Sequence, residues 1–237
     1  MLETLLNLFA NYKKTCSITN IQPGCVTFAR DKHYMKYLFK AKKDAWAIIP
    51  WGTSTPSCSP ESMKYYWSKY PEYEFTLFHN HINKTPDYNL HETVLINAEG
   101  LKVVNAPDGS KLPFIHTGKV VIQDDVKIGP YSVIHRGTMD NTIIRKGCRF
   151  GAYTNIGHNC DIGENTVMAA GVILNGGVRV GNNCWFGSGA LIRHHVTICD
   201  NVVIGLGSVV VKDITEPGIY VGNPAAYLKP VEKGWNF

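Results

Sequence analysis

The sequence lacks a long apolar run and any run of basic residues. No stretch of 18 apolar residues occurs among its 237 residues, so we expect no membrane span. The N-terminal MLETLLNLFANYKK has Glu3 early and its lysines late, which does not fit a signal peptide and makes the cytoplasm the expected location. The net charge of +5 is modest, which argues against a nucleic-acid-binding protein and fits small anionic ligands.

The seven cysteines lack CxxC spacing and are odd in number, so we expect neither a disulfide framework nor a zinc site. Cys148, Cys160 and Cys184 fall instead on a column of small residues described below. There they should be buried free thiols that pack as small hydrophobes.

A period of six residues runs through the second half of the chain. Twelve consecutive hits have a chance probability of about 5 in 100,000 at 44% hydrophobic content. The large apolar residues of this column are Ile144, Phe150, Ile156, Ile162, Met168, Leu174, Val180, Phe186, Ile192, Ile198, Ile204 and Val210. A second column of small or β-branched residues follows the first eleven of these by four positions, from Cys148 to Ser208.

Neither a helix nor a simple alternating strand keeps a period of six on one face. A parallel β-helix does, with a short strand on each face and the large residue pointing inward. Glycine often follows the large residue, as in Gly157 and Gly163, where we expect a corner that needs special φ/ψ values.

This pattern resembles the hexapeptide-repeat acyltransferases, whose coil is a left-handed triangular β-helix with 18 residues per turn. The repeat extends back through Ile122, Ile128 and Ile134, and ten residues instead of six separate Ile134 from Ile144. We therefore predict a left-handed parallel β-helix at 122–214, interrupted by an inserted loop at 135–143 that includes Thr138 and Asp140.

The first hundred residues have a different sequence pattern, which predicts a short amphipathic helix near Leu5, a strand in CVTFARD and an apolar strand in AWAIIPW. We predict a small α/β domain at 1–100, a hairpin linker at 101–121 around the turn-prone APDGS, and a C-terminal cap at 215–237. The predicted fold class is mainly β, with the α/β domain ahead of the coil.

The segment GCVTFARDKHYMKYL is similar to the uridine-binding domain of the lipid A pathway family that N-acylates a UDP-linked acylglucosamine. Phe28 and Tyr34 match the two rings that sandwich uracil in that family, while Asp31 stands where the family has Asn. The resemblance implies a nucleotide site at these three residues and leaves the base open. The alternative is that Phe28 and Tyr34 are ordinary core aromatics.

The segment KVVIQDDVKIGPYSVIHRGTMDNTII also resembles that family, with His135 in place of the expected Asp before Arg136. The resemblance implies that His135 and Arg136 contact the acceptor substrate. The coils that precede this segment in the family, and its terminal helices that receive acyl carrier protein, have no counterpart. The chain instead ends in GIYVGNPAAYLKP, which is similar to hexapeptide acetyltransferases that use acetyl-CoA.

A CoA thioester is accordingly the expected donor, with no metal cofactor. The small residues of one ridge of the coil would accommodate the pantetheine arm, and two lysines would meet its phosphates. These expected donor-site residues are Gly189, Ala190, Gly207, Ser208, Lys212, Asn223 and Lys229.

Transfer of an acyl group to an amine needs a base for the proton and a donor for the oxyanion. His158 lies in NIGHNCDIG, and adding 18 residues gives Gly176, one strand spacing of about 4.8 Å away. In the resembled family these positions are the base and the oxyanion donor. His195 falls where the family has a second histidine on the donor side, or it is a surface histidine.

The predicted function is acetyl-CoA-dependent N-acetylation of a nucleotide-diphosphate-linked amino sugar, of the kind used in polysaccharide biosynthesis, in a homotrimer with sites between neighbouring coils. An O-acetyltransferase acting on a sugar or amino-acid hydroxyl is the second candidate. A non-catalytic β-helix scaffold is a third. The zinc carbonic anhydrases of the same architecture need an H-x4-H pair, which this coil lacks.

Overall fold

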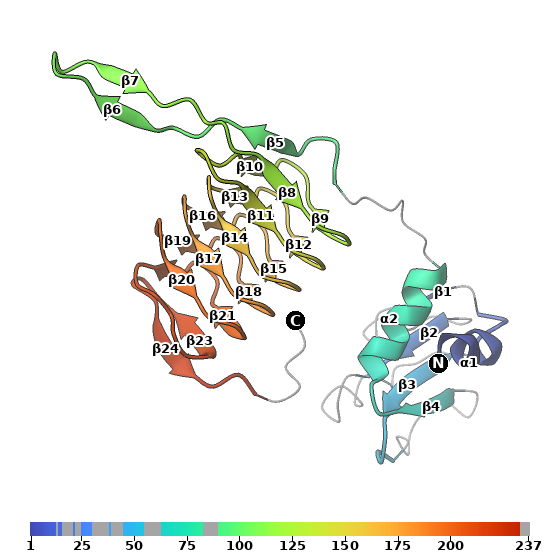
Figure 1. Ribbon diagram of the computed structural model, residues 1–237. Helices are drawn as coiled ribbons and strands as arrows, with labels where there is room; N and C mark the ends of the chain where they lie inside the picture. Colours follow the sequence, from blue (N-terminus) through green and yellow to red (C-terminus); the bar gives the residue numbers. More distant parts are fainter. Residues whose placement is uncertain are drawn as a thin grey trace. The chain divides into compact units, whose positions relative to one another are not determined.

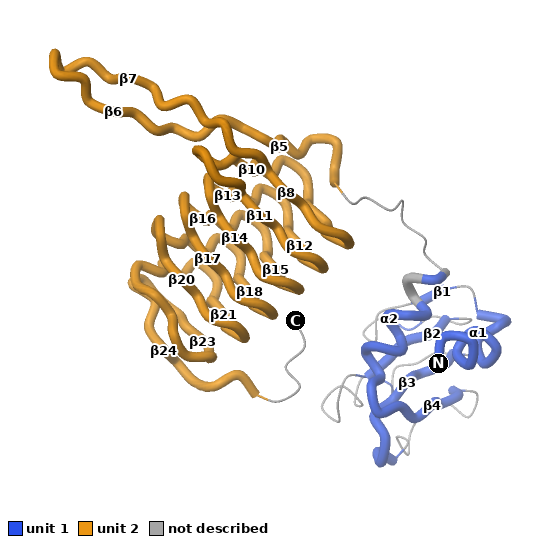
Figure 2. The backbone as a smooth tube through the Cα atoms, in the orientation of Figure 1, with its two compact units in different colours: residues 1–86 blue, residues 87–237 orange. Residues whose placement is uncertain are grey.

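Residues 120–229 wind into a parallel coil with three sheets (Figure 1). The computed structural model describes residues 1–12, 14–15, 21, 25–29, 38, 45–54, 63–82 and 90–232. The chain forms two compact units, residues 1–86 and 87–237 (Figure 2). The predicted fold class, mainly β with a β-helix after a small α/β unit, is confirmed.

Each face of the coil is one parallel sheet whose strands come from successive turns. The six-stranded sheet contains β5 (Leu95–Ala98), β10 (Val133–His135), β13 (Asn155–Ile156), β16 (Ile173–Leu174), β19 (Leu191–Ile192) and β22 (Val209–Val210). The five-stranded sheet contains β8 (Val120–Ile122), β11 (Thr142–Ile144), β14 (Asp161–Ile162), β17 (Arg179–Val180) and β20 (Thr197–Ile198).

The third sheet, seven-stranded, ends in the only antiparallel pair of the three coil sheets described, β23 with β24. Its strands are β9 (Lys127–Ile128), β12 (Arg149–Phe150), β15 (Val167–Met168), β18 (Trp185–Phe186), β21 (Val202–Ile204), β23 (Gly218–Val221) and β24 (Ala226–Lys229). The antiparallel pair closes this sheet at the C-terminal end of the coil.

The strand register measures the repeat directly. Ile144 pairs with Ile162 and Ile156 with Leu174, a step of 18 residues in each case. Ile122 pairs with Ile144 across a step of 22, because the extra four residues leave the coil as the loop between β10 and β11. The insertion was predicted at 135–143, and the loop itself is residues 136–141, because His135 belongs to β10 and Thr142 and Ile143 belong to β11.

Both columns of the sequence repeat face the interior. The twelve large apolar residues are at most 6% exposed, and the column from Cys148 to Ser208 is at most 1% exposed. Cys148, Cys160 and Cys184 are buried free thiols, as expected. Burial raises the pKa of Cys148 to about 11 and those of Cys160 and Cys184 to about 12. Cys25, in contrast, is disulfide-bonded, so the expectation of no disulfide is wrong at that residue.

We predicted unusual φ values at the glycines that follow the large apolar residues, but the structure has them at other positions. Positive φ occurs every six residues from position 147 to 207, and asparagine holds many of these sites, as in Asn159 with φ 59°. Gly157, which follows a large apolar residue, is needed for another reason. A Cβ there would lie 2.6 Å from the amide nitrogen of Gly176 on the next turn, so glycine permits close backbone approach rather than unusual φ.

The described residues of the N-terminal unit form a parallel four-stranded sheet and two helices. Its elements are α1 (Leu2–Leu8), β1 (Lys14–Thr15), β2 (Cys25–Phe28), β3 (Trp46–Pro50), β4 (Lys64–Ser68) and α2 (Pro71–Ile82), with strand order β1-β2-β3-β4. Leu5, Phe9 and Phe78 pack with Val26 and Ile48 in a buried cluster between helices and sheet. None of the helices in the described ranges is long and apolar enough to cross a membrane.

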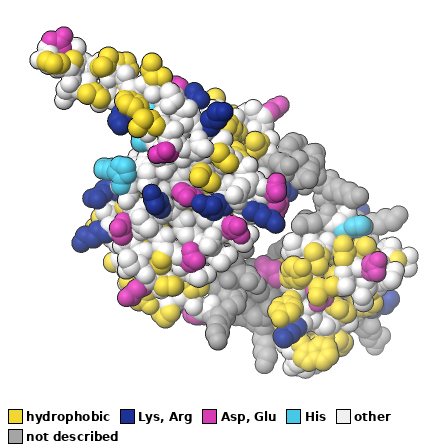
Figure 3. Space-filling model, viewed as in Figure 1, with side chains coloured by type: hydrophobic (Ala, Val, Ile, Leu, Met, Phe, Trp, Pro, Cys, Tyr) yellow, Lys and Arg dark blue, Asp and Glu magenta, His cyan; other side chains and the backbone are white. Residues whose placement is uncertain are grey.

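A hairpin arm leaves the coil between β5 and β8. Its strands β6 (Val103–Asn105) and β7 (Lys111–Pro113) project beyond the first turns (Figure 1). The arm carries exposed apolar side chains, including Val104 and Leu112, and yellow atoms gather over it in Figure 3. Strand β5, within the stretch predicted as N-terminal domain, pairs with β10 and so belongs structurally to the coil.

Candidate active site

One corner of the coil collects most of the predicted catalytic and acceptor residues. It is the corner between the six-stranded and the five-stranded sheets, where the chain passes from β5 to β8, β10 to β11, β13 to β14, β16 to β17 and β19 to β20. The hairpin arm, the inserted loop, His158, Gly176 and His195 therefore follow one another along this corner, one turn apart.

Asn159 holds the imidazole of His158. The Nδ1 atom of His158 lies 2.9 Å from Oδ1 of Asn159. That oxygen also accepts hydrogen bonds from the backbone N–H and the hydroxyl of Thr138, each at 3.0 Å. The Asn159 amide nitrogen donates to the carbonyl of Asp140 at 3.1 Å. The inserted loop thus fixes the orientation of Asn159.

This network also fixes the tautomer of His158. Because Oδ1 of Asn159 can only accept, Nδ1 of His158 must carry the proton in the neutral ring. The other nitrogen, Nε2, then has a free lone pair. A histidine with its Nδ1–H held in this way is arranged to act as a base through Nε2.

Gly176 lies against the basic nitrogen of His158. A Cβ at position 176 would be 2.5 Å from Nε2, 2.6 Å from Cε1 and 2.9 Å from Cδ2 of the His158 ring. Within the described part of the chain, the Gly176 N–H has no hydrogen-bond partner. The structure thus brings a backbone amide without a hydrogen-bond partner and a free imidazole nitrogen together at one corner of the coil.

The predicted acceptor residues His135 and Arg136 connect the inserted loop to the base of the hairpin arm. Nδ1 of His135 lies 3.0 Å from the carbonyl oxygen of Glu99. The Arg136 guanidinium forms a 3.3 Å ion pair with the Glu99 carboxylate and donates to the carbonyl of Gly118 at 2.9 Å. Both side chains therefore stand on the turn that precedes His158.

His116 is a site residue that the sequence did not reveal. It lies outside the six-residue repeat, between β7 and β8, and only the fold brings its ring to 5.4 Å from the centroid of His158. It is buried, and burial and the neighbouring charge of His158 lower its pKa. The sequence signal was a single histidine in PFIHTGK, which nothing in the repeat connects to position 158.

His195 lies on the turn beyond Gly176. Its backbone N–H donates to the Gly176 carbonyl at 3.0 Å, and its φ of 60° puts it in the left-handed region at an exposed corner. A Cβ on Gly177 would be 2.3 Å from Nδ1 of His195, so the ring lies over that glycine. The structure thus brings His195 into the same corner as His158 and Gly176.

The residues predicted for the donor do not form one group within the chain. Lys212 follows His195 on the same corner, one turn further along. Gly189 and Gly207 are exposed at a different corner, between the seven-stranded and six-stranded sheets. Ala190 and Ser208 face the interior, and Ser208 Oγ accepts a hydrogen bond from Gly222 at 3.1 Å.

Two further donor-site residues lie near the C-terminal end of the coil. Asn223 is exposed and precedes a cis peptide bond to Pro224, between β23 and β24. Lys229, in β24, is paired with Glu232 at 2.8 Å. Its ammonium group is thus already engaged with a carboxylate on the surface.

Of the predicted nucleotide-binding residues, only Phe28 is described. Its ring is half-buried and packs against Phe75 of α2 at a centroid distance of 4.7 Å. Asp31 and Tyr34 lie outside the described residues.

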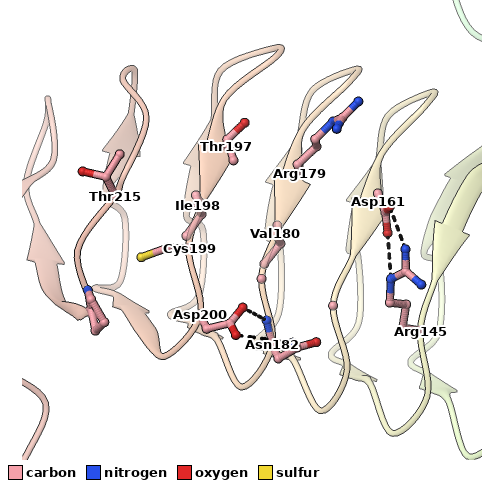
Figure 4. Close-up of a pocket in the computed structure, with 13 residues that line it drawn as sticks. Arg145, Asp161, Arg179, Val180, Asn182, Thr197, Ile198, Cys199, Asp200 and Thr215 are labelled. Carbon is pink, nitrogen blue, oxygen red and sulfur yellow. Dashed lines mark hydrogen bonds and ion pairs between the residues drawn. The ribbon is translucent and has the colours of Figure 1, made fainter.

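A shallow hollow of about 560 Å³ lies on the five-stranded face, away from the His158 corner (Figure 4). Arg145 donates two hydrogen bonds to Asp161 there, at 3.0 and 2.9 Å, and Asn182 bonds to Asp200. None of the predicted site residues lines it. Among the residues with described positions, no three His, Cys, Asp or Glu side chains converge as metal ligands would.

The coil matches a known sequence family. Residues 141–176 and 177–212 match the model described as bacterial transferase hexapeptide (six repeats). A UDP-3-O-acylglucosamine N-acyltransferase of Herminiimonas arsenicoxydans is 40% identical over 133 residues, which cover 56% of this chain and 38% of that protein. The protein of the same name from Coxiella burnetii is 37% identical over 131 residues, with coverages of 55% and 38%.

Among solved structures, the UDP-N-acetylglucosamine O-acyltransferase of Moraxella catarrhalis RH4 superposes with a TM-score of 0.52 and 16% identity. The match covers 89% of this chain and 74% of that one, and it establishes a shared fold. The resemblance to hexapeptide-repeat acyltransferases is thereby confirmed. The chain spans 38% of the length of the curated relatives described here.

Asn159 offers a direct test of how His158, the predicted base, is held. Asn159→Gly keeps a residue that tolerates φ near 60° but removes the acceptor for Nδ1 of His158. We expect kcat to fall about tenfold, since a hydrogen bond of about 0.5 to 1.5 kcal/mol that orients the base is lost. Steady-state kinetics with a thermal melt would measure this.

Asn165→Gly is the matched control, because it makes the same change at another left-handed corner. Its kcat should equal that of the parent chain. If both glycine variants lose activity equally, the loss comes from the corners and not from the orientation of His158.

Proposed function

We propose that this chain, whose coil carries the bacterial transferase hexapeptide repeat, is an acetyl-CoA-dependent N-acetyltransferase acting on a nucleotide-diphosphate-linked amino sugar. The observation that carries the proposal is the His158 ring, with its Nδ1–H on Asn159 and its free Nε2 beside Gly176. The relatives named as N-acyltransferases of a UDP-linked sugar support the reaction type and the substrate class.

In the proposed reaction, His158 and Gly176 assist direct transfer of the acetyl group. The amine nitrogen attacks the thioester carbonyl, forming the C–N bond, while Nε2 of His158 takes a proton from that nitrogen. The carbonyl oxygen becomes negative, and the N–H of Gly176 stabilises it. Collapse of this intermediate breaks the C–S bond, and the CoA thiolate takes the proton back from His158. The chain returns to its starting state.

The donor is proposed as acetyl-CoA on the basis of the C-terminal segment GIYVGNPAAYLKP. Gly189 and Gly207 present open backbone, since a Cβ at either position would meet nothing within 4 Å. A narrow pantetheine arm can lie against such a surface. Lys212, exposed on the His158 corner, is available for a phosphate.

The test uses the full chain, acetyl-CoA and a panel of UDP-, GDP- and dTDP-linked amino sugars. We expect release of CoA thiol with at least one of these sugars and a product whose added acetyl group is on nitrogen. The coil cysteines, with raised pKa values, should contribute little background to a thiol reagent. If no amino sugar in the panel leads to release of CoA, the proposal is wrong.

An O-acetyltransferase is the second candidate, because a histidine base removes a proton from a hydroxyl as well as from an amine. The same panel decides between them. Hydroxylamine cleaves an ester product and leaves an amide product intact. A product that hydroxylamine cleaves would show that the acetyl group is on oxygen and that the chain is an O-acetyltransferase.

We also propose that the active form is a homotrimer. The His158 corner and the Gly189–Gly207 corner are different edges of one coil, and in a trimer neighbouring subunits would bring one corner of each type together around a donor. Light scattering should give three times the mass of the 237-residue chain. A monomeric mass under conditions of full activity would contradict this.

Phe28 is proposed to stack on the nucleotide base. Phe28→Ala should raise KM for the nucleotide sugar and leave KM for acetyl-CoA unchanged, since stacking is worth about 1 to 3 kcal/mol per base. Phe75→Ala is the matched control, because it removes the ring on which Phe28 packs. If the two variants change both KM values in the same way, Phe28 has a core role.

A further inference from the structure

His116 is a buried titratable group beside the proposed base. Its side chain is 2% exposed, and its ring meets that of His158 at a centroid distance of 5.4 Å and an interplanar angle of 61°. The mechanism above gives it no role. It lies on the segment that returns from the hairpin arm to β8, and the repeat does not require a histidine there.

The hydrogen bond that His116 accepts argues against a role as a second base. The backbone N–H of Gly100 donates to its Nδ1 at 3.0 Å, so the proton of the neutral ring is on Nε2. If Nδ1 of His116 were protonated, its N–H would face the backbone N–H of Gly100 and the hydrogen bond would be lost. Nε2 itself is buried and makes no hydrogen bond with the described residues. His116 is thus held as a neutral ring.

Gly100 closes the hairpin base against both rings. A Cβ at position 100 would lie 2.2 Å from Cε1 of His116 and 3.3 Å from Cδ2 of His158. The hairpin base is in turn tied to the inserted loop, because the N–H of Thr117 donates to the carbonyl of Thr138 at 2.7 Å. Thr138 is the residue that also binds Asn159.

We propose that His116 is a positioning residue, which holds the His158 imidazole over Gly176 by filling the space between that ring and the hairpin base. Asn159 restrains His158 at one atom, Nδ1, and a single hydrogen bond leaves the ring free to rock. The edge contact with His116 restricts that motion. The catalytic consequence rests on the function proposed above, whereas the restraint on the ring does not.

Histidine serves this position better than an apolar ring. Its Nδ1 satisfies the Gly100 amide, so one side chain both anchors the hairpin base and contacts His158. Phenylalanine would keep the ring contact and lose the anchor. Alanine would lose both. These two substitutions therefore separate the parts of the proposed role.

The first experiment does not need a substrate. Diethyl pyrocarbonate modifies neutral imidazole nitrogens, and peptide mass spectrometry of the full chain gives the rate at His158 alone. We expect His116→Ala to raise this rate severalfold and His116→Phe to keep it near that of the parent. Leu101→Ala, an exposed change beside Gly100, should leave it unaltered. An unchanged His158 rate in a folded His116→Ala chain overturns the proposal.

Gly100→Ala gives an independent test if His116→Ala does not fold. The added methyl group must displace the His116 ring, which remains present, and the His158 rate should rise as it does for His116→Ala. An unchanged rate in Gly100→Ala overturns the proposal in the same way. Both outcomes are readable even if the chain has no acetyltransferase activity.

If the parent chain is active, kcat and KM of the variants measure the effect of His116 on catalysis. Because misplacement of a catalytic group by a fraction of an ångström is costly, we expect His116→Ala to lower kcat about tenfold, with KM for acetyl-CoA unchanged. His116→Phe should recover most of that loss. A role confined to folding would lower the melting temperature and leave kcat per folded molecule unchanged, which contradicts the proposal.

Discussion

His158→Asn is expected to lower kcat by about 100- to 10,000-fold, the usual contribution of a general base. The substituted amide can still occupy the corner but has no nitrogen that takes a proton at neutral pH. Substrate binding should be near normal, because the N–H of Gly176 and the rest of the surface are unchanged. The measurements are kcat and KM across a pH series, with acetyl-CoA binding by calorimetry.

His91→Asn is the control for loss of a histidine as such. Its ring forms a hydrogen bond with the hydroxyl of Thr93, just before β5. In the six-stranded sheet, β10 lies between β5 and β13, the strand that precedes His158. That variant should keep the parent rate. If His158→Asn stays within a few fold of the parent across the pH series, the base is another residue, and His195 and His135 are the next to replace.

Gly176→Ala should have the second largest effect, a fall in kcat of about 100-fold. The new methyl group would lie 2.5 Å from Nε2 of His158, and the ring must move away from it. A displacement of a catalytic group by about 1 Å costs on this order.

Gly157→Ala separates this local effect from damage to the coil. Its Cβ would lie 2.6 Å from the backbone nitrogen of Gly176 and 2.7 Å from the carbonyl carbon of Asn175, so the turns themselves must shift. We expect a lower melting temperature for Gly157→Ala and a nearly unchanged one for Gly176→Ala. Parent-like kcat in a folded Gly176→Ala chain would remove Gly176 from the site.

The coil was predictable because its core constraint repeats along the sequence. Every strand of the coil needs a large inward residue such as Ile156 or Ile162, so the same weak signal recurs twelve times between residues 144 and 210. The corners were less predictable. Asparagine adopts the left-handed conformation more readily than most residues, so the positive φ of Asn159 and Asn165 is not evident from the glycine pattern. Gly157 is misleading in the opposite way, because its glycine is required by close backbone approach and not by a positive φ.

The candidate site was predictable only where the repeat fixes its geometry. His158 and Gly176 differ by 18 residues, and a parallel register places such residues side by side. His116 is 42 residues from His158, outside the period, and its contact depends on the path of the hairpin arm. The link from Thr138 to Asn159 likewise depends on how the four extra residues fold.

The 18-residue register also determines where the protein comes apart under thermal fluctuation. Each turn bonds only to the turn before and the turn after, so it behaves as a link in a one-dimensional chain whose stability is shared with its neighbours. The terminal turns have one neighbour each and open first. The β13 turn that carries His158 lies between β10 and β16, so fraying at either end leaves the alignment of His158 with Gly176 intact.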